Sequence, residues 1–278
     1  MKKILIAVDP IHLSQNTLAF GLYLARLTRS KITGVFLENL EAESKPVVNS
    51  SYDSIFLEYQ PNENDTSVKE KIKSLQQNIQ YFRSYFENHG VVCSIHEDKG
   101  VPIEEIIYES RYADLLVIDV ESDFTETKGV PGNFARKMMA EAECPVIIAP
   151  QTFNGVHEII FAYNSSKSCM YAIKQFADLL PELESLKITI LEIHQPGQDP
   201  YLHNDKFKEW LETRFSDIHY LFLSGQTETE LISFLLNKDK SFVIMGAYGR
   251  TALSNFFKRS TADIVLKTSS QPIFIAHH

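Results

Sequence analysis

The residue types best suited to chemistry gather near the end of the chain, where residues 245–261 read MGAYGRTALSNFFKRST. Glycines at Gly246 and Gly249 would let the backbone approach a phosphate without interference from a Cβ atom. Ser260 stands just before an apolar run, and the N–H groups at the start of a helix favour anions. These features are typical of a phosphate-binding loop. A turn followed by a capped helix explains them equally well, because Ser260 and Asp263 match a capping box.

The hydrophobic pattern of the first half predicts the elements that hold such a loop. Residues 4–8 are continuously apolar, as in a parallel strand covered on both faces. Apolar residues recur at helical spacing in 14–29 and in about 67–89, and Ser14 is a plausible N-cap. The polar stretch from about 38 to 66 predicts a long loop. Strands that alternate with helices indicate a parallel α/β sheet; the further strands are predicted at 31–39, 91–97, 113–120 and 144–150.

The same order begins again after residue 156. The run HEIIFAYNSS matches KKILIAVDPI, and the later strands match in turn. A shift of 127 residues places Pro145 on Pro272 and Asp119 on Gly246 without a gap. The repeat is too long for a solenoid unit. It predicts an α/β protein of two tandem doubly wound domains, 1–150 and 151–278, each with its own five-stranded, mainly parallel sheet.

Composition excludes several classes of protein. The formal net charge is −9, so the chain lacks the excess of basic residues that nucleic-acid-binding proteins use to contact phosphates. No apolar stretch approaches the roughly 18 residues of a membrane span. Cys93, Cys144 and Cys169 lie far apart, which argues against a zinc site and a disulfide framework. We therefore expect a cytoplasmic protein without nucleic-acid or membrane partners. We also expect no metal site, because no HxH or HExxH spacing involves His12, His194 or His203.

The tandem repeat, the opening ILIAVD and the late segment IMGAYGRTALSNFFKRS resemble the universal stress protein family. The resemblance covers nearly the whole chain. It implies a stress-response role and a doubly wound fold in the cytoplasm. It also implies ATP with magnesium as ligand, bound through a motif G-x2-G-x9-G-[ST] after the fourth strand. By the same resemblance, PVIIAP and PIFIAH would meet as an intramolecular pseudo-dimer, and a further homodimer stays open.

The second half departs from the family motif at two places. Arg259 replaces the third glycine, and Asn164 replaces the acid that the family carries after its first strand, near the ribose. The sequence therefore predicts a degenerate adenine-nucleotide site that binds weakly or not at all. Its candidate residues are Asn164, Gly246, Gly249, Arg250, Arg259, Ser260 and Thr261.

The first half departs further. Asp9 keeps the family's acid, but Asp119 and Ser122 stand where the first two glycines belong. Gly132 holds the third place, and Asn133 replaces the serine or threonine. Carboxylates would face the phosphates, so the first half is predicted not to bind ATP.

Two other functions compete with a nucleotide-binding stress protein. One is a module that binds a different small ligand, or a protein partner, on the same scaffold. The other is an enzyme of the related adenine-nucleotide α-hydrolase superfamily. The enzyme is the least favoured, because the sequence has no G-x-S-x-G elbow and no acid–base pair that can be placed together. We accordingly assign no catalytic residue, and weak ATPase activity stays open.

Overall fold

The computed structural model describes residues 1–38, 44–51, 54–61, 66–99, 102–120, 122, 133–195, 197, 205–246 and 270–276. In the first half, the strands of the main sheet are β1 (Lys3–Val8), β2 (Lys31–Glu38), β5 (Cys93–Lys99), β6 (Leu115–Ile118) and β7 (Val146–Ile148). In the second half they are β8 (Glu158–Tyr163), β9 (Lys187–His194), β10 (Ile218–Ser224), β11 (Ser241–Gly246) and β12 (Ile273–Ala276).

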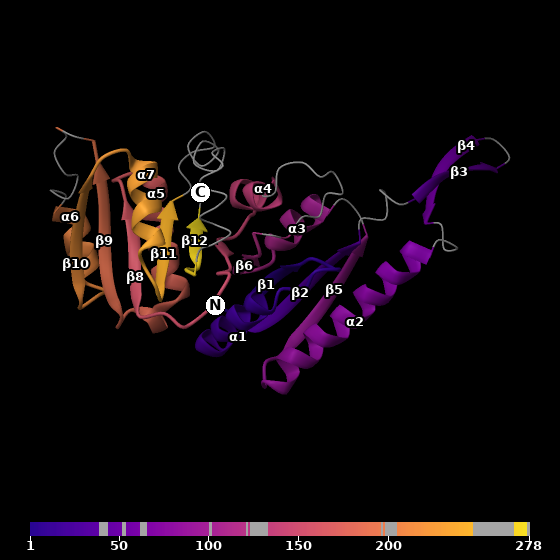
Figure 1. Ribbon diagram of the computed structural model, residues 1–278, viewed down its shortest axis with the longest axis horizontal. Helices are drawn as coiled ribbons and strands as arrows, with labels where there is room; N and C mark the ends of the chain where they lie inside the picture. The colour runs from indigo at the N-terminus through magenta and orange to yellow at the C-terminus, as the bar shows by residue number, and fades with distance from the viewer. Residues whose placement is uncertain are drawn as a thin grey trace.

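The two halves repeat one strand order. The first half runs β5-β2-β1-β6-β7, and the second runs β10-β9-β8-β11-β12 (Figure 1). Within each half, all strand pairs of the main sheet are parallel. The crossing from one side of the first strand to the other, between β2 and β6 or between β9 and β11, is the signature of a doubly wound fold. The α/β class and the repeated order predicted from the sequence are confirmed.

The fifth strands of the two halves join them. β7 pairs with β12 in the antiparallel direction, and Ile147 lies opposite Phe274. The prediction that these two segments meet is thus confirmed. Each half supplies the five parallel strands that the sequence predicts, but the two sets are not separate sheets, because this pairing joins them into one sheet of ten strands. The physical reason is that each fifth strand is an edge strand of its half, and pairing satisfies its open N–H and C=O groups.

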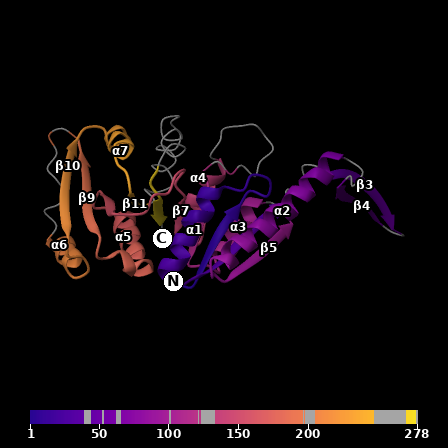
Figure 2. The same cartoon turned by 60° about the horizontal axis from the view of Figure 1, so that its bottom comes forward.

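Helices cover both faces of this sheet (Figures 1 and 2). One apolar cluster joins the sheet to α1 (Gln15–Thr28), α2 (Thr66–Asn88), α5 (Lys167–Leu179) and α6 (Asp205–Glu212). The other joins it to α3 (Pro102–Ser110), α4 (Asn133–Glu141) and α7 (Thr227–Leu236). A single 3-10 turn, Pro181–Leu183, follows α5 in the described part of the chain. Burial of both faces explains why the strands are continuous apolar runs in the sequence.

The segment predicted as a long loop contains a hairpin. β3 (Ser44–Ser51) and β4 (Ser54–Pro61) pair antiparallel in a separate two-stranded sheet. Figures 1 and 2 show this hairpin beyond α2, at the end of the molecule farthest from β10. The prediction was wrong because Pro, Asn, Ser and acidic residues outweighed short runs of strand-forming residues, VV at 47–48 and IFL at 55–57.

Helix termini follow the local sequence signals. The Ser14 hydroxyl accepts a hydrogen bond from the Thr17 N–H at 3.3 Å and caps α1 as predicted. Gly90 ends α2 with a φ of 75°, a conformation that glycine adopts without steric cost. Among the helices that the structure describes, none has the length and apolar character needed to cross a membrane.

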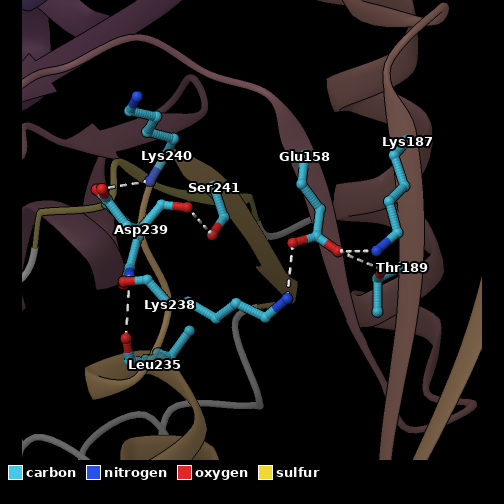
Figure 3. A network of polar contacts seen from close by, with 9 residues as sticks. Glu158, Lys187, Thr189, Leu235, Lys238, Asp239, Lys240 and Ser241 are labelled. Atoms are coloured by element: carbon cyan, nitrogen blue, oxygen red, sulfur yellow. Dashed lines mark hydrogen bonds and ion pairs between the residues drawn. The ribbon is translucent and has the colours of Figure 1, made fainter.

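A partly buried ion cluster joins the amino ends of strands in the second half (Figure 3). The Glu158 carboxylate of β8 accepts hydrogen bonds from the Thr189 hydroxyl at 2.6 Å and from the Lys238 ammonium at 2.8 Å. The Lys187 ammonium lies 3.0 Å from the same carboxylate. Burial alone would raise the pKa of Glu158, but the hydrogen bonds from Lys238, Thr189 and Lys187 outweigh it and lower this pKa to about 2. The cluster ties β8, β9 and the segment after α7 together.

Candidate functional site

The candidate residues lie where neighbouring parallel strands end. Asp9 follows β1 and Asp119 follows β6, and these two strands are paired. In the second half, Asn164 follows β8 and Gly246 ends β11, and these strands are paired as well. The carboxyl ends of parallel strands are the usual position of ligand sites in open α/β sheets. Each half therefore brings its first-strand and fourth-strand candidates to the same edge.

In the second half, Gly246 lies directly against the start of α5. A Cβ atom at this position would be 2.4 Å from the backbone N of Cys169 and 2.5 Å from the backbone C of Ser168. Both atoms belong to backbone, which cannot turn away as a flexible side chain can. Helix packing therefore requires a glycine at 246, independently of any phosphate.

The turn before α5 is ordered by its own polar side chains. The Asn164 Oδ1 atom accepts a hydrogen bond from the Ser166 N–H at 3.2 Å. The Ser166 hydroxyl accepts one from the Cys169 N–H at 3.1 Å, so Ser166 is the N-cap of α5. Lys167 is exposed in the first turn of α5. The edge of the second half thus combines the N-terminus of a helix with a lysine, and both favour an anion.

The remaining loop candidates fall outside the part of the chain that the structure describes. These are Gly249, Arg250, Arg259, Ser260 and Thr261 in the second half and Gly132 in the first, together with His203. Asn133 is placed as the first residue of α4.

In the first half, a carboxylate stands where the second half has its glycine. Asp119 is 7% exposed, and its Oδ2 atom accepts a hydrogen bond from the Thr17 hydroxyl at 3.1 Å. Thr17 occupies in α1 the place that Cys169 occupies in α5, three residues after the capping serine. Ser122 is also buried, and its N–H donates to the Asp119 carbonyl at 3.3 Å. Where the second half has Gly246, which has no side chain, the first half therefore has a negatively charged carboxylate.

Asp9 organises the loop between β1 and α1. Its Oδ1 atom accepts hydrogen bonds from the N–H groups of Ile11 and His12, each at 2.8 Å. This is the Asx-turn geometry that aspartate favours. The His12 Nδ1 atom lies 3.7 Å from the same oxygen. The carboxylate thus remains at the edge of the sheet, close to Asp119 and with one oxygen bonded to its own turn.

A cleft of about 750 Å³ opens over these two carboxylates. Its walls come from the loop after β1, from α2, from the end of β6 and from the segment between the halves. Three of its lining residues, Asn78, Tyr81 and Gln151, belong to no motif in the sequence. One signal was present, since Asn78 and Tyr81 interrupt the apolar stripe of α2 on its flank. Gln151 gave no signal, because it lies in an irregular segment.

The thiol nearest the second-half site is not a nucleophile. Burial raises the pKa of Cys169 to about 12. The Cys169 Sγ atom donates to the Ala162 carbonyl at 3.3 Å. Burial likewise raises the pKa of Cys144 to about 12 and that of Cys93 to about 11. All three cysteines are therefore protonated thiols near neutral pH.

Comparisons with known proteins agree with this architecture. No family model matches the sequence. A universal stress protein of Synechocystis sp. is 20% identical over an alignment of 293 residues, which covers 98% of this chain and 99% of the relative.

Two solved structures resemble the fold over its full length. A universal stress protein from Archaeoglobus fulgidus is 16% identical with a TM-score of 0.67, covering 99% of this chain and 97% of that chain. A putative universal stress protein from Pseudomonas aeruginosa is 17% identical with a TM-score of 0.53, covering 99% and 92%. This chain therefore has the tandem universal stress protein fold, and the family resemblance of its sequence extends over its whole length to a curated member.

Proposed function

We propose that the chain acts in a stress response in the cytoplasm and binds an adenine nucleotide, ATP with magnesium, weakly in its second half. One observation carries the proposal. Asn164 directly follows β8 and Gly246 ends the neighbouring strand β11, beside the capped N-terminus of α5, and the sequence after Gly246 carries the partial motif. We propose the boundary between the two domains at residues 150 and 151, in the segment that joins β7 to β8.

The charges of the two edges favour the second half for an anion. Lys167 and the first turn of α5 provide positive potential beside Asn164. In the first half, the corresponding edge carries the Asp9 and Asp119 carboxylates. A polyphosphate there would bring like charges together in a partly buried cleft, which is unfavourable.

Calorimetric titration of ATP with magnesium tests the proposal. Arg259 stands in the sequence where the family has a glycine that meets the phosphates, and an arginine at that place would take up room that the ligand needs. We expect Arg259→Gly to bind ATP about tenfold more tightly than wild type, a difference of about 1.4 kcal/mol. Weaker binding by the variant would make Arg259 a phosphate ligand, since a guanidinium can pair with phosphate oxygens. Absence of binding by both proteins would leave residues 245–261 as a plain turn and helix cap.

A matched change in the first half distinguishes the two sites. We expect Asp9→Ala to leave the affinity for ATP unchanged, because its carboxylate lies in the acidic cleft of the other half. The same titration measures it, with circular dichroism to verify that the variant is folded. A loss of affinity of tenfold or more would show that the first half is the working nucleotide site.

A further inference from the structure

The cleft in the first half has a chemistry of its own, separate from the proposed nucleotide site. At about 750 Å³ it falls within the range of small-molecule sites. Its polar lining comes from four separate parts of the chain: the turn between β1 and α1 with the start of α1, helix α2, the end of β6, and Gln151 in the segment between the halves. Gln151 connects two of these parts, because its carbonyl accepts a hydrogen bond from the Asn16 amide at the start of α1 and its side chain donates to Asp119 at the end of β6, at 3.5 Å. The cleft is therefore built jointly by these segments.

The charge of the cleft is negative. Asp9 and Asp119 are its carboxylates, and the lining that the structure describes includes no lysine or arginine. Asp119 is almost fully buried, and the Asp9 side chain is 12% exposed. Charges with so little contact with water are weakly screened, so they act strongly on a ligand within the cleft. A cation is favoured there and an anion is repelled.

The hydrogen-bonding groups of the lining point to the same kind of ligand. The Asn78 amide donates to the carbonyls of Pro10 and Ile11 at 2.8 and 3.2 Å, and the Tyr81 hydroxyl donates to the Gln15 side chain at 2.8 Å. The amides of Asn16 and Gln151 also donate within the protein. Asn78 uses both of its amide N–H groups in this way, and Asn16 and Gln151 each use one of two, so the amide donors of the described lining are partly engaged within the protein.

Several side-chain oxygen atoms of the lining remain available to accept hydrogen bonds from a ligand. Within the described part of the chain, the Asp9 Oδ2 atom and the side-chain oxygens of Asn16 and Asn78 have no hydrogen-bond partner. The Tyr81 ring, 43% exposed, adds an aromatic surface of the kind that attracts organic cations. A lining with two carboxylates and spare acceptors matches a ligand that carries positive charge and several N–H donors.

We propose that this cleft binds a small organic polyamine, with its ammonium groups paired to Asp9 and Asp119. The proposal does not depend on nucleotide binding in the second half. The acid that the family resemblance assigns to a ribose would in this chain hold an ammonium group instead. The change of Gly to Asp at the fourth strand, from Gly246 in one half to Asp119 in the other, accounts for the change in ligand class.

Calorimetric titration of spermidine into the full chain at 150 mM salt tests the proposal. We expect binding of one spermidine per chain, and no binding of 1,4-butanediol, which offers hydroxyl groups without charge. Asp9→Asn keeps the Oδ1 acceptor that orders the turn but removes the charge. We expect it to weaken spermidine binding by about tenfold, since a charge-assisted hydrogen bond is lost.

Glu209→Gln is the matched control, because it removes one exposed carboxylate from α6 in the other half. We expect it to change spermidine affinity by less than about twofold, as for a distant and screened charge. Equal weakening by both variants would mean non-specific attraction to an acidic protein and would overturn the proposal. So would absence of spermidine binding, or equal affinity for 1,4-butanediol. Arg259→Gly separates the two proposals, because it should leave spermidine affinity unchanged whether or not it affects ATP.

Discussion

Gly246→Ala should destabilise the protein by about 3 kcal/mol, at the upper end of the cost of overpacking a well-packed site. The added Cβ would lie 2.4 Å from the backbone N of Cys169, so β11 and the start of α5 would have to separate. Because α5 also packs on β12, the disturbance would reach the strand that joins the halves. Urea unfolding followed by circular dichroism measures the loss.

Gly90→Ala is the matched control. A Cβ atom at Gly90 meets nothing within 4 Å, and its only cost is the positive φ of 75°. We expect a loss of about 1 kcal/mol there, the usual cost of a left-handed conformation for alanine. If both variants lost the same stability, the close approach of α5 to Gly246 would be contradicted. Packing against α5 would then not be the reason for a glycine at position 246.

Glu158→Gln should lower the free energy of unfolding by about 2 kcal/mol at pH 7, the range found for hydrogen bonds to charged groups. A glutamine side chain is neutral, so it cannot compensate the positive charge of Lys238, whose ammonium lies 2.8 Å from the native carboxylate. The pKa of Glu158 is lowered to about 2 in the folded protein from an ordinary value of 4.5. The stabilisation is therefore fully present above pH 4.5 and is lost as the pH falls toward 2.

The measurement is urea unfolding of wild type and variant at pH 7, 4 and 3. The difference between the two proteins should shrink as the pH falls, because the unfolded wild-type chain takes up a proton at Glu158 near pH 4.5 whereas the folded protein does so only near pH 2. Glu182→Gln, an exposed acid in the same half, should differ from wild type by less than about 0.5 kcal/mol at each pH. A difference for Glu158→Gln that stayed constant with pH would contradict the assigned ion cluster.

Much of the fold could be predicted from the sequence because each strand is buried on both faces. A run such as Ile4–Val8 must be covered by helices, and the repeated order of strand segments in the two halves identifies the matching strands. The meeting of the fifth strands was also predicted, but only through the family resemblance. The continuous sheet was not predicted, because a pairing of edge strands leaves no periodicity in the sequence.

The candidate sites were predicted in part. The order of the predicted elements places four candidates at the carboxyl ends of strands, as observed: Asp9, Asp119, Asn164 and Gly246. The sequence could not distinguish a glycine needed for phosphate from one needed for packing, because the approach of α5 to Gly246 is a tertiary contact. The cleft was missed for the same reason. Its lining combines Asn78 with Gln151, which are distant in the chain and belong to no motif.

Photoaffinity labelling with an azido-ATP, followed by digestion and mass spectrometry of the labelled peptides, tests most directly the central claim that nucleotide binds in the second half alone. The azide reacts with residues next to the bound base and so identifies the half that holds the nucleotide. We predict labelled peptides from residues 151–278, with labelling abolished by excess unlabelled ATP and unaffected by spermidine. Labelled peptides from residues 1–150 that excess ATP protects would contradict the account, as would labelling that ATP does not diminish.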